Sequence, residues 1–86
     1  MNLKQYLNQS SDGDITAIGN EMFPNQEVEG VNNGHHFWIS ILDDKGAGIM
    51  RLGVFGDGEV EVYGSNAGFS LPRFNEAMKK RGVNFE

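Results

Sequence analysis

The chain has 86 residues, which is enough for one domain spanning residues 1–86 and no more. Its 7 basic and 12 acidic residues give a formal net charge of -5, which argues against direct nucleic-acid binding because that needs a dense basic face. It has no cysteine, which excludes disulfides, thiolate nucleophiles and cysteine metal sites. The start of the chain does not resemble a secretory signal, and the longest apolar stretch, around Phe37–Leu42, is too short to span a bilayer. We therefore expect a cytoplasmic protein that does not bind membranes.

The first third of the chain predicts two short helices. Asn2 can cap a helix that runs to about Gln9, and Ser11 or Asp12 can cap a second one. Pro24 ends the second helix, because the residue before a proline is disfavoured in helical geometry. The apolar stripes of the two helices are Leu3, Tyr6 and Leu7, and Ile15, Ile18 and Met22.

The middle of the chain predicts an antiparallel β-meander. Asn33-Gly34 is a dipeptide that favours a tight hairpin turn, and glycine-rich turns follow at Asp44–Gly48 and Gly56–Gly58. The expected strands are a short one at about Glu27–Val31, then His35–Asp43, Ile49–Phe55 and Glu59–Tyr63.

The last part predicts a loop at Gly64–Gly68 and then a helix. Ser70 can cap this helix, with Pro72 in its first turn, where proline is tolerated. Cationic residues lie at its carboxyl end, where they offset the helix dipole, and Gly82 is placed as its left-handed stop.

Burial selects the register of the last two strands. Val60 and Val62 must face the core, because the glutamates beside them must not. A three-residue turn at Gly56–Gly58 then places Val54 opposite Val60 and Leu52 opposite Val62. In the preceding hairpin, we expect Asp43 to pair with Gly48. That pairing places Ile41 opposite Met50 and Ile39 opposite Leu52, so that three strands share one apolar face, on which the final helix packs.

The opposite side of the sheet, which we call the Trp38 face, follows from the same register. Trp38 lies flat over Gly53, and Arg51 lies near Tyr63 and diagonal to Glu61. The expected partner-binding residues on this face are Trp38, Arg51, Phe55, Glu59, Glu61 and Tyr63. His36, Ser40, Leu42 and Ile49 share it. A solvated face seldom carries so many bulky apolar side chains, so we expect it to contact a partner, or else to be covered by the opening helices or the loop Asn66–Phe69.

Catalytic and metal-binding motifs do not emerge. His35 and His36 point to opposite sides of a strand, and Asp12-Gly13-Asp14 does not begin a calcium loop, because its twelfth residue is a phenylalanine. No nucleophile elbow or phosphate loop is present. Glu59 and Glu61 are the one pair of carboxylates that could act together. We expect no catalytic residue, no metal and no cofactor.

These features predict an α+β fold: an antiparallel three- to four-stranded β-meander with two short N-terminal helices and one C-terminal helix packed on one face. They favour a non-enzymatic protein-binding module that acts on a basic protein partner through the Trp38 face. A small acidic inhibitor, an immunity-type protein or an accessory protein of a phage or mobile element fits this pattern, although no motif identifies a family. Two alternatives remain: a homodimer formed through the same face, and a small ligand-binding protein or enzyme that uses Glu59 and Glu61.

Overall fold

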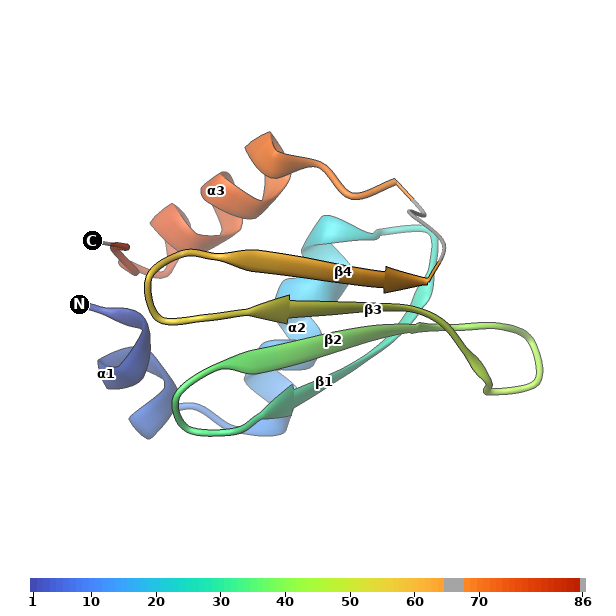
Figure 1. Ribbon diagram of the computed structural model, residues 1–86, viewed down its shortest axis with the longest axis horizontal. Coiled ribbons are helices and arrows are strands. Elements are labelled where there is room, and N and C mark those ends of the chain that lie inside the picture. Colours follow the sequence, from blue (N-terminus) through green and yellow to red (C-terminus); the bar gives the residue numbers. More distant parts are fainter. Residues whose placement is uncertain (65–67, 86) are drawn as a thin grey trace.

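The computed structural model describes residues 1–64 and 68–85, and it has the predicted α+β architecture (Figure 1). Residues 65–67 of the expected loop lie outside the described residues. The elements in chain order are α1 (Leu3–Asn8), α2 (Asp12–Met22), β1 (Glu27–Asn32), β2 (Phe37–Leu42), β3 (Gly48–Val54), β4 (Val60–Gly64) and α3 (Leu71–Lys80). The four strands form one antiparallel sheet in the order β1-β2-β3-β4, so the weakly signalled first strand is confirmed.

Local capping fixes where the helices begin. Asn2 and Ser11 each accept a backbone hydrogen bond from the third helical residue, whose side chain bonds back to the cap, so both form capping boxes. Ser70 caps α3 through its hydroxyl, which accepts from the backbone N–H of Arg73. Gly82 has a φ of 73°, and thereby supplies the left-handed residue predicted after this helix.

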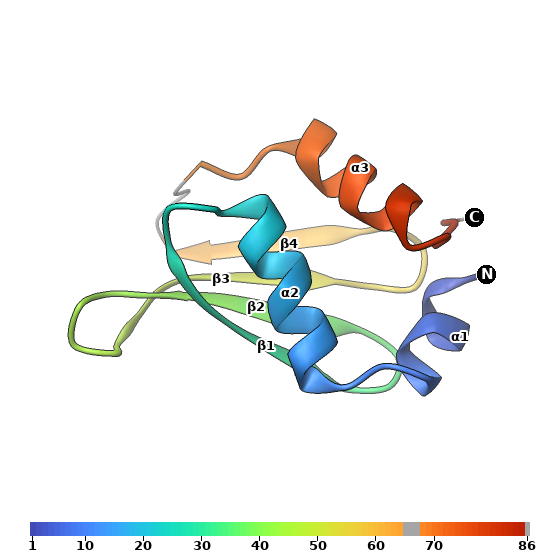
Figure 2. The same ribbon diagram turned by 180° about the vertical axis from the view of Figure 1, so that it is seen from behind.

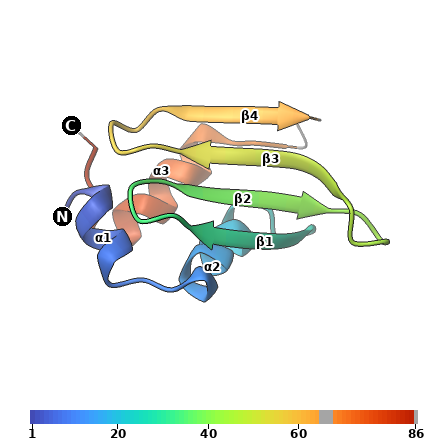
Figure 3. The same ribbon diagram turned by 60° about the horizontal axis from the view of Figure 1, so that its bottom comes forward.

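The helices all lie on one side of the sheet, as Figures 2 and 3 show. Three helices fit on one side of this small sheet. The reason is that α2 covers β1 while α3 lies behind β2 and β3, and the short α1 lies at the end of the sheet that carries the β1–β2 and β3–β4 turns. The apolar face assigned to the final helix alone is therefore shared between α2 and α3.

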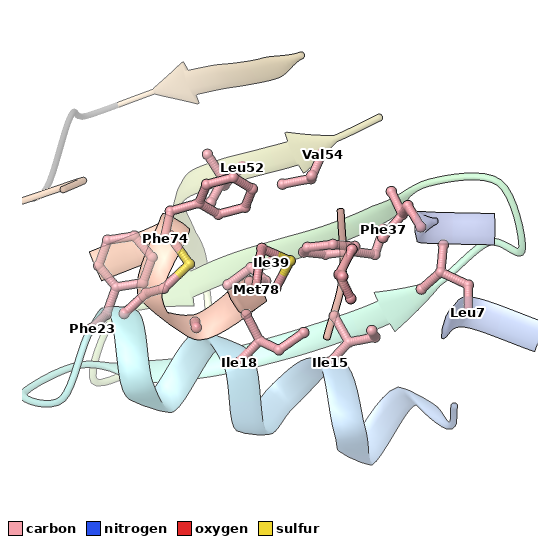
Figure 4. Packing of buried hydrophobic residues seen from close by; sticks show 14 of the residues in the cluster. Leu7, Ile15, Ile18, Phe23, Phe37, Ile39, Leu52, Val54, Phe74 and Met78 are labelled. Atoms are coloured by element: carbon pink, nitrogen blue, oxygen red, sulfur yellow. The ribbon is translucent and has the colours of Figure 1, made fainter. Parts of the chain in front are cut away.

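One apolar core fills the space between the helices and the sheet (Figure 4). Ile15 and Ile18 of α2 point toward Ile39 of β2, and Phe74 and Met78 of α3 reach the same layer. All five side chains are buried, with at most 2% of their surface exposed. Burial of this kind is the main favourable contribution to the folding of such a small domain.

The predicted pairing of the last three strands is confirmed at its core positions. Ile39 lies opposite Leu52, which in turn lies opposite Val62, and Val54 lies opposite Val60. The three-residue turn before β4 is also as predicted, because the Phe55 N–H donates to the Glu59 carbonyl at 3.0 Å.

The predicted pairing of Asp43 with Gly48 is wrong. The Asp43 N–H donates to the Ala47 carbonyl at 2.8 Å, and the Asp43 carboxylate accepts from the backbone N–H groups of Lys45 and Ala47, which makes the turn one residue shorter. A β-bulge at Ile49 then restores the alignment, since Leu42 lies opposite Gly48 while Ile41 lies opposite Met50. The shorter turn and the bulge offset each other, so the core register was predicted correctly.

The first hairpin turns one residue later than Asn33-Gly34 alone would place it. The Asn33 N–H donates to the His36 carbonyl at 3.0 Å, so Gly34 and His35 form the two-residue loop. Gly34 has a φ of 86°, and glycine at the first loop position is the requirement of a type II′ turn.

The helix α2 approaches β1 closely at Gly30. A Cβ on Gly30 would lie 2.4 Å from the backbone nitrogen of Thr16 and 2.6 Å from the backbone carbon of Ile15. On the helix side, a Cβ on Gly19 would lie 3.0 Å from side-chain atoms of Val28 and Ile39. The strand and the helix can approach this closely only because both positions lack a side chain.

Replacing Gly30 should therefore destabilise the fold strongly. We expect Gly30→Ala to lower the free energy of unfolding by about 2–3 kcal/mol, because the atoms in the way belong to helix backbone and cannot swing aside. Gly48→Ala is the matched control, since a Cβ on that strand glycine meets nothing within 4 Å. Urea unfolding followed by circular dichroism measures both variants, and equal midpoints would contradict this account of the α2–β1 contact.

The ion pair between Glu21 and Arg81 ties the end of α2 to the end of α3. Arg81 and Lys80 both donate to the Glu21 carboxylate, the second at 3.3 Å, and the hydrogen bond from Arg81 is the main reason that the pKa of Glu21 lies below its ordinary value of 4.5. The Glu21 side chain is 34% exposed, so water screens the interaction.

This ion pair should make stability depend on pH in a defined direction. Because folding lowers the pKa of Glu21, its contribution is present at neutral pH and is lost as the pH falls through the folded-state value. We expect Glu21→Gln to cost about 0.5–1 kcal/mol at pH 7 and much less near pH 3. Asp44→Asn, an equal charge change in an exposed turn, is the control. Urea unfolding at both pH values gives the comparison, and a cost that does not shrink in acid would refute the assignment.

Candidate functional site

The Trp38 face lies on the side of the sheet away from all three helices (Figure 3). The opening helices therefore do not cover it, and the alternative that they would is wrong. Of the loop Asn66–Phe69, residues 66 and 67 lie outside the described residues. Phe69 packs against Phe74 on the helix side.

Trp38 is held at the centre of this face by its neighbours. It lies over Gly53 as predicted, since a Cβ there would lie 2.7 Å from two atoms of the indole ring. The Arg51 guanidinium carbon lies 4.3 Å from the centroid of the same ring, a cation–π contact. These contacts limit the freedom of the indole while leaving it partly exposed.

Other aromatic rings extend the cluster in both directions from Trp38. Phe55 meets Trp38 edge-on with ring centroids 6.0 Å apart, and Tyr63 lies at 5.9 Å. His36 stacks on Phe55 at 5.1 Å with the ring planes 19° apart, and it meets Trp38 edge-on. The sequence placed His36 on this face, but it was not among the expected partner-binding residues.

Arg51 and Tyr63 are directly opposite each other, as predicted. Only Tyr63 forms a hydrogen bond with Glu61. The Tyr63 hydroxyl donates to the Glu61 carboxylate at 2.7 Å, while Arg51 turns toward Trp38 instead. The hydrogen bond to Glu61 raises the pKa of Tyr63, because it stabilises the protonated phenol.

Two further glutamates belong to this face that the sequence analysis did not place there. Glu29 of β1 lies opposite Ser40, and Glu27 lies opposite Leu42, so both side chains point to the same side as Trp38. Val31 lies opposite Trp38 itself and is 38% exposed. The alternation Glu27-x-Glu29-x-Val31 was visible in the sequence, but it could be assigned to a face only once the first hairpin's loop was known.

The charges on the Trp38 face are therefore arranged around its aromatic centre. Glu27 and Glu29 lie on β1, which is one outer strand. Glu61 lies on β4, the other outer strand, and Glu59 is the residue just before β4. Arg51 lies between them, over the indole. The centre is apolar and the two outer strands are acidic, which is the anatomy of an apolar contact patch with a charged rim.

A shallow hollow of about 290 Å³ opens beside the aromatic cluster. It is lined by Ser40, Gly48, Ile49, Met50, Arg51, Tyr63 and Gly64. Ile49, the residue at the β-bulge, lies in the wall of this hollow and is 40% exposed. Neither Glu59 nor Glu61 lines this hollow, so the two carboxylates do not converge on an enclosed space.

Within residues 1–64 and 68–85, no three histidine, aspartate or glutamate side chains are grouped to hold a metal ion. None of the helices in that part of the chain has the length and apolar character required to cross a bilayer. In comparisons with protein-family models, curated proteins and solved structures, the chain shows no match.

The support that Gly53 gives to Trp38 can be tested directly, because the chain has a single tryptophan. We expect Gly53→Ala to push the indole away from the sheet, shift its fluorescence to longer wavelength and increase quenching by acrylamide. The loss of stability should be smaller than for Gly30→Ala, since a side chain can move where a helix backbone cannot. Gly48→Ala, on the same strand, should leave the spectrum unchanged. An unchanged spectrum in Gly53→Ala would show that Trp38 does not rest on Gly53.

Proposed function

We propose that this chain is a cytoplasmic, non-enzymatic protein-binding module that recognises a basic protein surface through the Trp38 face. The observation that carries the proposal is an aromatic cluster that none of the three helices covers, fixed on the sheet by Gly53 and Arg51 and flanked by glutamates on both outer strands.

The aromatic centre is suited to supply affinity. Tryptophan, tyrosine and arginine are the residues most often found at the energetic centres of protein interfaces, and Trp38, Tyr63 and Arg51 are in contact or adjacent here. Trp38 is already restrained by the sheet in the free protein. A restrained side chain loses less conformational entropy when a partner binds, so more of its contact energy remains as affinity.

The glutamates are suited to select the partner. Glu27 and Glu29 on one outer strand, and Glu59 and Glu61 at the other, would attract lysine and arginine side chains around an apolar contact. Charges at the rim chiefly raise the association rate and exclude wrong partners. The same charges would repel a phosphate backbone, which makes nucleic acid a poor ligand despite the exposed aromatic rings.

The arrangement of Glu59 and Glu61 favours binding over catalysis. The Glu61 carboxylate accepts a hydrogen bond from Tyr63, and neither glutamate lines the hollow on this face. General acid–base catalysis needs a substrate held within hydrogen-bonding reach of both groups, which an enclosed space would provide.

We extend the proposal to an inhibitory, immunity-type or accessory role of the kind found in phages and mobile elements. A small acidic domain that covers a basic surface would block whatever that surface does. This extension depends on the element order and the charge, which is an association and not a property of the site.

The proposal predicts that one protein partner is lost when Trp38 is truncated. We expect Trp38→Ala to weaken capture of this partner from the native host by at least about 30-fold, or roughly 2 kcal/mol. Leu71→Ala is the control, because Leu71 is 55% exposed but lies on α3, behind the sheet. Binding of the purified partner is then measured by calorimetry at two salt concentrations, with weaker binding expected at higher salt.

A photo-cross-linking amino acid placed at Tyr63, which is 54% exposed, should cross-link to the same partner, whereas one at Leu71 should not. Equal capture by wild type and Trp38→Ala would refute the proposal, as would a partner that cross-links only from Leu71.

A further inference from the structure

The two outer strands of the sheet, β1 and β4, differ in the hydrogen bonds that their outward-pointing backbone groups form. On β1, the Gly30 N–H donates to the Thr16 hydroxyl at 3.0 Å, and the Asn32 N–H donates to the Asp12 carboxylate at 2.7 Å. Both acceptors belong to α2, which lies along this strand. The chain's own helix therefore occupies the β1 edge.

In the part of the chain that the structure describes, no helix occupies the β4 edge in this way. The Phe55 N–H donates to the Glu59 carbonyl, so these two residues form a hydrogen-bonded pair. Hydrogen-bonded and non-hydrogen-bonded pairs alternate along an antiparallel hairpin, so the N–H and carbonyl groups of Glu61 and Tyr63 point toward β3. The backbone groups of Val60 and Val62 then point outward. Among residues 1–64 and 68–85, no hydrogen bond reaches those outward groups.

The helices cover β4 only in part on its inner side, since Val60 packs against the core while the strand is exposed from Val62 onward. Figure 3 shows β4 as the outermost strand, with α3 behind β3 and β2. Val62 faces the core side opposite the fully buried Leu52, as the sequence predicted, yet it remains 38% exposed. An unpaired strand edge with an exposed valine is a template for pairing with another strand.

We propose that β4 pairs with β4 of a second copy of this chain, antiparallel across a two-fold axis, so that the two sheets join into one sheet of eight strands. This inference is independent of the partner proposed for the Trp38 face, and it differs from a homodimer formed face to face through Trp38. The two Trp38 faces would lie side by side on one surface and stay accessible.

Charge and strand length select the register of this pairing. With the axis at Val62, all five residues of Val60–Gly64 are paired, each Val62 lies opposite its counterpart, and Glu61 lies opposite Tyr63 of the second copy. With the axis at Glu61, two glutamates would be directly opposite each other, which is unfavourable. With the axis at Tyr63, only three residues of each β4 would be paired.

The blocked β1 edge explains why pairing would stop at two copies. A chain with two free edges could add copies without limit, whereas a two-fold contact between single free edges closes on itself. The self-complementary register favours a second copy over an unrelated strand. Because a strand pair of this length buries little side-chain surface, we expect a dissociation constant of roughly 10 μM to 1 mM.

Sedimentation equilibrium from about 10 μM to 1 mM tests the proposal, since this range spans the expected dissociation constant. The wild type should shift from monomer to dimer and no further. Val62→Lys should stay monomeric, because the proposed register would place two like charges directly opposite each other at the axis. Val31→Lys is the matched control, since Val31 is also 38% exposed on an outer strand but lies beside Trp38. It should dimerise like the wild type.

A monomeric wild type throughout this range would overturn the proposal. Loss of the dimer in Val31→Lys but not in Val62→Lys would also overturn it, by moving the interface to the Trp38 face. Growth beyond a dimer would show that the contact does not close.

NMR on wild-type protein, with labelled and unlabelled chains mixed, gives a test that does not depend on any variant. The register with its axis at Val62 brings the Hα of Glu61 close to the Hα of Tyr63 in the second copy, as in any non-hydrogen-bonded antiparallel pair. That intermolecular contact should appear at high concentration. Intermolecular contacts confined to Trp38 and Phe55 would contradict the proposal.

Discussion

At Gly30, the backbone of α2 lies so close to β1 that a Cβ would be 2.4 Å from the nitrogen of Thr16. This contact fixes the position of α2 along the edge of the sheet and brings Thr16 and Asp12 to the outward N–H groups of β1. With α2 placed there, the space behind β2 and β3 is left for α3, and all the helices gather on one side. The exposed Trp38 face and the uncovered β4 edge both follow from this arrangement.

The two faces of the sheet use glycine for opposite purposes. On the helix side, Gly30 and Gly19 let backbone and apolar side chains come together, which closes the core. On the other side, Gly53 gives Trp38 a flat surface to lie on. The cost of glycine in a strand is conformational entropy, and at these positions close packing offsets it. An indole that is supported but still accessible is a group prepared for contact with another molecule.

Much of the sheet could be read from the sequence because its pattern is local. The alternation of Val60 and Val62 with glutamates, and the three-residue turn before them, placed Leu52 in the core. Ile39 and Trp38 were placed on opposite sides of β2 through the expected pairing of Asp43 with Gly48. The Asp43 turn was predicted one residue too long, since nothing in the pattern showed that its carboxylate would bind two backbone N–H groups. The bulge at Ile49 corrected for this, because burial of Ile41 and Met50 is worth more than one unpaired residue.

The sequence by itself determined the helix caps, the strand order of the meander and the face on which Trp38 lies. These depend on side-chain alternation and on hydrogen bonds between residues a few positions apart. Only the tertiary structure decided that the helices share one side, that Glu27 and Glu29 join the Trp38 face, and that Arg51 lies over the indole and not beside Glu61. Those outcomes depend on contacts between segments far apart in the chain, where packing and the space available choose among arrangements that local patterns allow equally.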